Sequence, residues 1–172
     1  MPKKLFPFLL VFFIGCLTYF GHELAHLFIH LGLGHRVTFK MNHILIHQPQ
    51  PIVAPIHSVF VYGSGVLFTF LQGMIGYRVF IKNQSQWGFT LLLAAFTLRF
   101  AAAMLGIATN SDEMKISIAM GLPIYFWTII VFVGFLILIY KGKKKNGLNL
   151  TSVLGQFLIL LLAIYLFSLI EI

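Results

Sequence analysis

Two histidines and a glutamate occur in the stretch His22-Glu23-Leu24-Ala25-His26, which matches the pattern H-E-x-x-H. On a helix the two histidines lie one turn apart on the same face, so both imidazoles can bind one Zn²⁺. Glu23 would lie beside the metal, where it can take a proton from a water whose pKa the metal has lowered to roughly 7. The pattern is short and also arises by chance, so its meaning depends on its surroundings.

A catalytic zinc site usually has three protein ligands and a fourth position for water. The whole chain has four acidic side chains, namely Glu23, Asp112, Glu113 and Glu171. We prefer Asp112 as the third ligand, with Glu113 as the alternative, because no other unassigned acid lies in the central part of the chain. His30 continues the spacing of His22 and His26, but a straight helix places it about 12 Å from His22 along the axis. Ligands of one zinc lie roughly 2 Å from it, so His22, His26 and His30 cannot all bind the same ion.

The composition is that of an integral membrane protein. Of the 172 residues, 59% are hydrophobic and 9% are charged, and the mean hydropathy is +0.95, whereas soluble domains carry about 25% charged residues. The basic residues behind the net charge of +8 lie at the ends of apolar runs, which indicates contact with lipid headgroups and no binding of nucleic acid. Ionisable groups inside membrane segments cost free energy, so we treat the motif as a candidate functional site.

The apolar runs predict an all-α polytopic membrane protein with about five transmembrane helices, at about 5–31, 57–81, 87–109, 122–140 and 150–170. We expect a single integral membrane domain over residues 1–172. Residues 36–47 partly alternate apolar and polar, which predicts a short strand or hairpin between the first two helices. Asn110 or Ser111 fits a helix N-cap with the acids after it in the first turn, and residues 141–147 read as a basic loop.

Two further polar residues lie within the predicted membrane helices. Arg99 cannot lose its charge, so it needs a carboxylate, a set of carbonyls or a route to the headgroups. A direct role in binding substrate is the alternative. Gln72 could hydrogen-bond a substrate or make a contact between helices.

The motif on a membrane helix, the strand-like segment, the glycine-bearing second helix and the later membrane-embedded Asp112 together resemble the site-2 protease family of intramembrane zinc metalloproteases. The resemblance covers about residues 5–123. The family's aspartate usually lies in an Asn, Pro and Leu-Asp-Gly context, whereas here Ser111 precedes Asp112 and Glu113 follows it. The family's Gly-Pro-x-x-Asn pattern is absent from the second helix. The chain therefore resembles a minimal, divergent member, expected in the cell membrane of a bacterium.

The resemblance implies hydrolysis of a peptide bond in or near a transmembrane segment of another membrane protein. It implies one Zn²⁺ per chain on His22, His26 and Asp112, with Glu23 as general base and then proton donor. The lipid bilayer and a membrane-protein substrate are the expected partners. The substrate must unwind to expose its scissile bond, and residues 36–47 could hold it as an added strand.

Two other readings remain open. His22/His26 and His43/His47 have the H-x-x-x-H spacing of membrane di-iron oxygenases, although the paired H-x-x-H-H boxes of that class are absent. The chain could also be a non-enzymatic protein that binds metal or retains only a protease-like scaffold. In that case Glu23→Gln would leave function intact. We expect His35, His43, His47 and His57 at the surface or the membrane interface.

The orientation in the membrane also remains open. With five helices, most basic residues fall on one side, namely Lys3, Lys4, Arg78, Lys82, Lys141 and 143–145. The positive-inside rule makes that side cytoplasmic. Site-2 proteases that begin with the motif helix generally run the other way.

Overall fold

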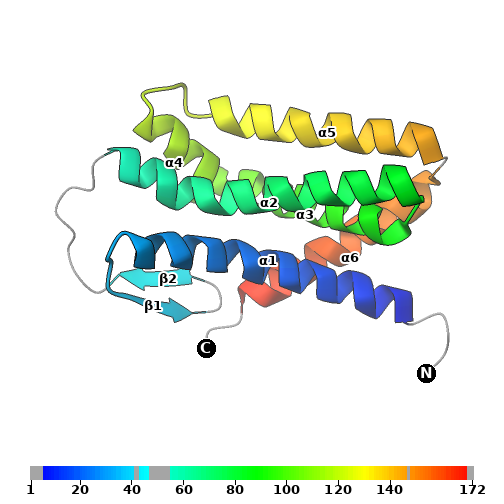
Figure 1. Cartoon of the computed structure of the whole chain (residues 1–172), viewed down its shortest axis with the longest axis horizontal. Helices are drawn as coiled ribbons and strands as arrows, with labels where there is room; N and C mark the ends of the chain where they lie inside the picture. Colours follow the sequence, from blue (N-terminus) through cyan, green and yellow to red (C-terminus); the bar gives the residue numbers. More distant parts are fainter. Residues whose placement is uncertain (1–5, 41–42, 47–54, 147, 170–172) are drawn as a thin grey trace.

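The computed structural model describes residues 6–40, 43–46, 55–146 and 148–169, and these ranges form six helices and a two-stranded sheet (Figure 1). The elements are α1 (Phe6–Gly32), β1 (Val37–Lys40), β2 (His43–Ile46), α2 (Pro55–Asn83), α3 (Gln86–Thr109), α4 (Asp112–Ala119), α5 (Phe126–Asn146) and α6 (Leu150–Ser168). All except α4 and the two strands are long and apolar enough to cross a membrane. The predicted fold class is therefore confirmed.

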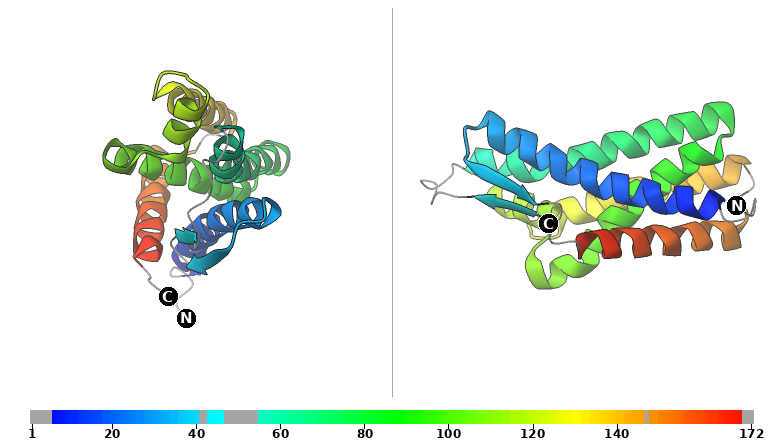
Figure 2. Two further views of the ribbon diagram at one scale, coloured as in Figure 1. Left: turned by 90° about the vertical axis from the view of Figure 1, so that its left-hand side faces the viewer. Right: turned by 90° about the horizontal axis from the view of Figure 1, so that it is seen from below.

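The five long helices run along the length of the molecule (Figures 1 and 2). The sheet and α4 lie at the end where α1 finishes, and the connections α2–α3 and α5–α6 lie at the opposite end (Figure 1). β1 and β2 pair antiparallel, with Val37 opposite Ile46. This hairpin lies within residues 36–47, where the alternation predicted it.

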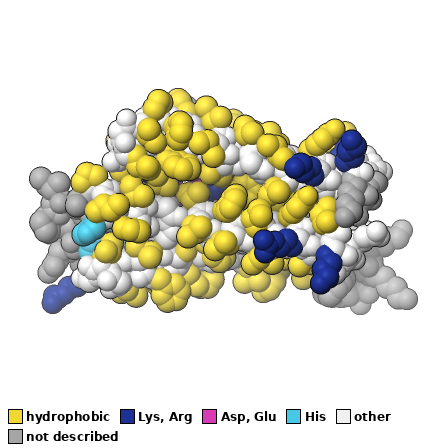
Figure 3. Space-filling view, turned by 45° about the horizontal axis from the view of Figure 1, so that its top comes forward, with side chains coloured by type: hydrophobic (Ala, Val, Ile, Leu, Met, Phe, Trp, Pro, Cys, Tyr) yellow, Lys and Arg dark blue, Asp and Glu magenta, His cyan; other side chains and the backbone are white. Residues whose placement is uncertain are grey.

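α3 is the central helix of the bundle. It packs against α1, α2, α5 and α6, and it is the most buried of the five candidate spans. Its residues Phe89, Leu92, Leu93 and Phe96 form the core together with side chains from the surrounding helices. The other four long helices turn many Leu, Ile and Phe side chains outward, as lipid contact requires. The space-filling view accordingly shows a continuous hydrophobic middle with Lys and Arg near the ends (Figure 3).

The backbones of α2 and α3 touch through glycines. A Cβ atom on Gly76 would lie 2.7 Å from the carbonyl oxygen of Gly88, and one on Gly88 would lie 2.5 Å from the backbone nitrogen of Phe80. Small residues allow this close approach between membrane helices. The contact fixes α2 against the central helix.

α1 ends in a Schellman motif. Gly34 has a φ of +76° and donates to the carbonyl of Leu31, while the amide of His35 donates to the carbonyl of His30, both at 3.0 Å. The motif also brings the Nδ1 atoms of His30 and His35 to 2.8 Å from one another. His35 is buried, so of the two places expected for it, the protein surface is wrong.

Two boundaries differ from the prediction. α5 begins at Phe126 instead of residue 122, because the chain reverses at Gly121, whose φ is +67°, and the amide of Phe126 closes a turn onto the carbonyl of Pro123. The predicted basic loop at 141–147 is wrong over 141–146, which continue α5. Lysine is a good helix former, so the end of the apolar run does not end the helix.

Candidate metal centre

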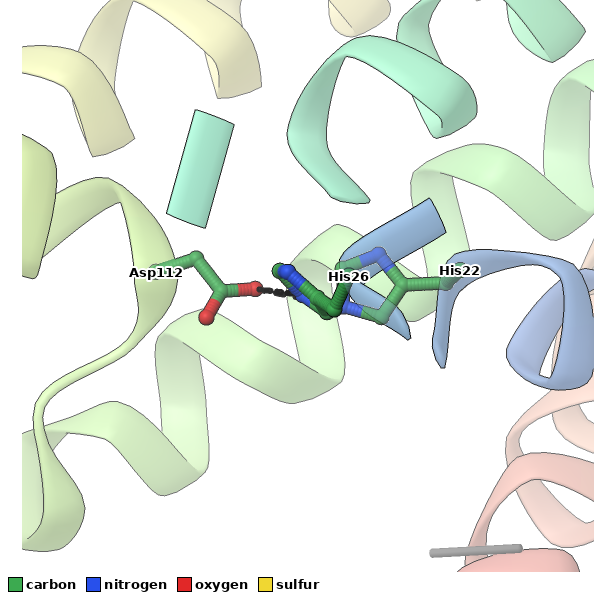
Figure 4. Close-up of side chains that lie close together, drawn as sticks. All are labelled: His22, His26 and Asp112. Carbon is green, nitrogen blue, oxygen red and sulfur yellow. Dashed lines mark hydrogen bonds and ion pairs between the residues drawn. The ribbon is translucent and has the colours of Figure 1, made fainter. Parts of the chain in front are cut away.

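His22 and His26 on α1 meet Asp112, the first residue of α4, across the inside of the bundle (Figure 4). The Oδ2 atom of Asp112 lies 3.1 Å from Nε2 of His22 and 3.4 Å from Nε2 of His26, and the two Nε2 atoms are 3.1 Å apart. Ligands of a tetrahedral zinc, each 2.0–2.1 Å from the metal, would lie about 3.3 Å from one another. The three side chains could therefore hold a metal ion with little movement.

The helical period of α1 turns the two imidazoles inward. Thr18, His22 and His26 follow one another at intervals of four residues, and all three are buried, His22 to 5% exposure and His26 to 7%. Leu17 and Phe28 lie on other faces and are exposed. The polar stripe of α1 thus faces protein, as the cost of polar groups in lipid requires.

α2 passes directly over the imidazole pair at Gly65. A Cβ atom there would lie 2.5 Å from both Nδ1 of His22 and Nε2 of His26, closer than real Cβ contacts. Any side chain at this position would therefore push the two ligands apart.

The ring of His26 is held in the tautomer that a metal needs. Its Nδ1 lies 2.7 Å from the carbonyl oxygen of Val61 and 3.3 Å from the hydroxyl of Ser64, which itself donates to the same carbonyl. A carbonyl oxygen only accepts, so Nδ1 carries the proton and the lone pair of Nε2 points into the centre.

Asp112 is placed by the start of α4. Ser111 is the N-cap of this helix, as the sequence predicts, and its hydroxyl accepts from the amide of Met114 at 3.4 Å. Burial opposes ionisation of the Asp112 carboxyl, but the adjacent imidazoles of His22 and His26 hold its pKa well below its usual range. The third donor of the cluster is therefore a carboxylate ready to bind a cation.

Arg99 on α3 and Glu113 on α4 form a buried ion pair beside the three donors. Nη1 of Arg99 lies 3.1 Å from Oε1 of Glu113 and 3.6 Å from Oδ2 of Asp112, and its Nη2 lies 3.1 Å from Nδ1 of His22. Arg99 is 3% exposed and Glu113 is 1% exposed. The predicted need of Arg99 for a carboxylate is met here.

No family model, characterised protein or solved structure matches this chain. The chemistry of the centre therefore rests on its own donors and charges.

The formal charges around the centre favour a cation. Glu23 is half-buried and interacts electrostatically with His26, Asp112 and Lys115. When ionised, the carboxylates of Glu23, Asp112 and Glu113 outnumber the positive charges of Arg99 and Lys115. Buried charge without a counter-ion is strongly unfavourable, so a bound cation would stabilise this set.

Other residues considered from the sequence lie elsewhere. Gln72 lies two turns further along α2 than Gly65, and its amide donates to the hydroxyl of Thr18 at 2.8 Å and the carbonyl of Leu91 at 3.2 Å. Gln72 therefore makes the contact between helices, and these hydrogen bonds do not direct it to His22 or His26. His30 pairs with His35. His57 is half-buried, the side chain of His43 is not described, and His47 lies outside the described residues.

Sequence reasoning missed the contributions of α2. From the sequence alone Gly65 and Ser64 are small residues that favour close packing of helices, and the carbonyl of Val61 carries no signal. The Gly63-Ser64-Gly65 stretch is the one feature that could have drawn attention, because closely spaced small residues mark a place where another group approaches the backbone.

Proposed function

We propose that this chain is an intramembrane zinc metalloprotease of the site-2 protease type, which hydrolyses a peptide bond in or near a transmembrane segment of another membrane protein. The observation that carries the proposal is the triangle of Nε2, Nε2 and Oδ2 donors, 3.1–3.4 Å on its edges, inside a bundle of membrane helices. Glu23 directly follows one of the ligands in the chain.

Zinc is the metal that the donor set suits best. Two imidazoles and one carboxylate are a known ligand set of catalytic zinc, and three protein ligands leave one position for water or substrate. The excess of carboxylates around the centre also favours a cation, so we expect one Zn²⁺ per chain.

Glu23 is the proposed general base. When bound, zinc would acidify water and polarise the scissile carbonyl. The carboxylate of Glu23 takes the proton of the attacking water and then gives a proton to the leaving amine. Its position on α1 between His22 and His26 and its electrostatic interaction with Asp112 support this role.

The hairpin is the proposed holder of the unwound substrate. β1 and β2 pair with one another among the described residues. The hairpin packs against α1, the helix that carries both imidazoles. An extended segment added to this sheet would have its backbone hydrogen bonds satisfied beside α1.

A non-enzymatic metal-binding membrane protein is the second candidate. It is supported by Gln72. The amide of this residue could orient a substrate, but in the structure it hydrogen-bonds groups on neighbouring helices.

The two candidates differ in what Glu23→Gln does. We would express the parent, Glu23→Gln and His22→Ala at equal levels and survey the membrane proteome for new termini within or beside apolar segments. The proposal predicts new termini with the parent alone, while Glu23→Gln still binds zinc. The same termini with Glu23→Gln as with the parent would contradict proteolysis by this site.

A further inference from the structure

Two neighbouring carboxylates contact Arg99, but only that of Asp112 belongs to the cluster of metal donors. Asp112 contacts both His22 and His26, whereas Oε1 of Glu113 is paired with Arg99 at 3.1 Å. The other oxygen of Glu113, Oε2, is buried without a hydrogen-bond partner. A buried carboxylate oxygen in this state is unfavourable and would accept any cation within reach.

Arg99 is a fixed cation at this second carboxylate. It belongs to the central helix, where its neighbours Thr97 and Leu98 are buried, and its guanidinium cannot lose its proton. It spans the cluster, with Nη1 on the two carboxylates and Nη2 on His22. Arg99 therefore already supplies the counter-charge that Glu113 would otherwise seek from a metal.

We infer that Arg99 is a positioning residue that sets the number of protein ligands at the metal centre. By pairing with Glu113 it keeps this carboxylate from becoming a fourth protein ligand. Zinc sites with four protein ligands are closed and structural, whereas catalytic sites have three and keep one position open. The inference rests on the proposed function, and it assigns to the Arg99–Glu113 pair the role of keeping the site catalytic.

Replacing the guanidinium should convert the open site into a closed one. In Arg99→Gln the buried carboxylate of Glu113 loses its partner, and the metal becomes the remaining strong cation beside it. We expect metal affinity to rise at least tenfold, since a ligand is gained and a repelling positive charge is lost. The exchangeable position should disappear at the same time.

Cobalt in place of zinc would report this change directly. We would titrate Co²⁺ into detergent-purified parent, Arg99→Gln and Arg99→Gln/Glu113→Gln, and then add acetohydroxamate while recording the visible absorption spectrum. The parent should bind Co²⁺ and change its spectrum with acetohydroxamate. Arg99→Gln should bind more tightly and show no change. The double variant, which has no spare carboxylate, should regain the parental response.

Parental affinity and a parental acetohydroxamate response in Arg99→Gln would overturn the inference, while metal binding by the parent would leave the proposed function standing. A parent that binds neither Co²⁺ nor Zn²⁺ would overturn both. If Arg99→Gln does not fold, Glu113→Gln decides the matter. It should keep the response to acetohydroxamate, because Glu113 is not a ligand, and loss of Co²⁺ binding in this variant would overturn the inference.

Discussion

Gly65 contributes to the metal centre because it has no side chain, which leaves room for the two imidazoles. It lies on α2 against both imidazoles, so the distance between the two Nε2 donors depends on a position that never contacts a metal. His22, Glu23 and His26 could be named from residue type and spacing alone, and the third ligand could be narrowed to Asp112 or Glu113. Gly65 could not, because its role depends on a contact between α1 and α2 that no local pattern encodes.

Gly65→Ala should therefore weaken zinc binding at least tenfold, because the new methyl group would displace the rings of His22 and His26. Gly63→Ala is a matched control on the same helix, since a Cβ atom there meets no other group within 4 Å. Either alanine favours the helix itself by about 0.5–1 kcal/mol. A competition titration with a zinc chelator would compare the two variants, and equal affinities would show that the imidazoles do not depend on Gly65.

At the scale of elements, the short helix α4 delivers Asp112 to the histidines on α1. Its start is defined by the Ser111 cap, and its end by the reversal at Gly121. Sequence reasoning anticipated the cap and the acids of the first turn, because capping is a local property. It could not show that Asp112 faces the imidazoles while Glu113 faces Arg99, since that choice depends on how α4 packs against α2 and α3.

Ser111→Ala should lower the free energy of unfolding by about 1 kcal/mol and also weaken zinc binding several-fold, because the first turn of α4 would hold Asp112 less firmly. Asn149→Ala removes the corresponding cap of α6, where the side chain of Asn149 accepts from the amide of Thr151 at 3.1 Å. It should cost similar stability without affecting zinc. Thermal unfolding and zinc titration of both variants in detergent would separate the effects. Equal zinc affinity in the two would contradict a positioning role for this cap.

The membrane helices were predictable because apolar length is visible in the sequence. Four of the five spans agree with the expected positions to within a few residues at each end. The central place of α3 was not predictable from its hydropathy, which resembles that of the other spans. Its greater burial results from contacts with α1, α2, α5 and α6, which hydropathy does not encode.

At the scale of the whole molecule, the distribution of charge sets the centre apart from the rest of the chain. Three of the four acidic residues gather at the centre. Most described Lys and Arg side chains lie near the end where α2 meets α3 and α5 meets α6 (Figure 3). The positive-inside rule predicts that this end is cytoplasmic, which would place the metal centre nearer the opposite face.

In this arrangement a bound cation would stabilise the folded state. A ligand that binds only the folded chain stabilises it by about 2.7 kcal/mol at a concentration of one hundred times its dissociation constant. The same cation would neutralise carboxylates that are otherwise costly inside the bundle. We therefore expect His22, His26 and Asp112 to bind one metal ion.

The most direct test is the metal content of protein purified in detergent with zinc present, for the parent, His22→Ala, Asp112→Ala and Glu23→Gln. The expected result is about one zinc per chain in the parent and in Glu23→Gln, and its loss in His22→Ala and Asp112→Ala. A parent without zinc, or full zinc content in His22→Ala and Asp112→Ala, would contradict it.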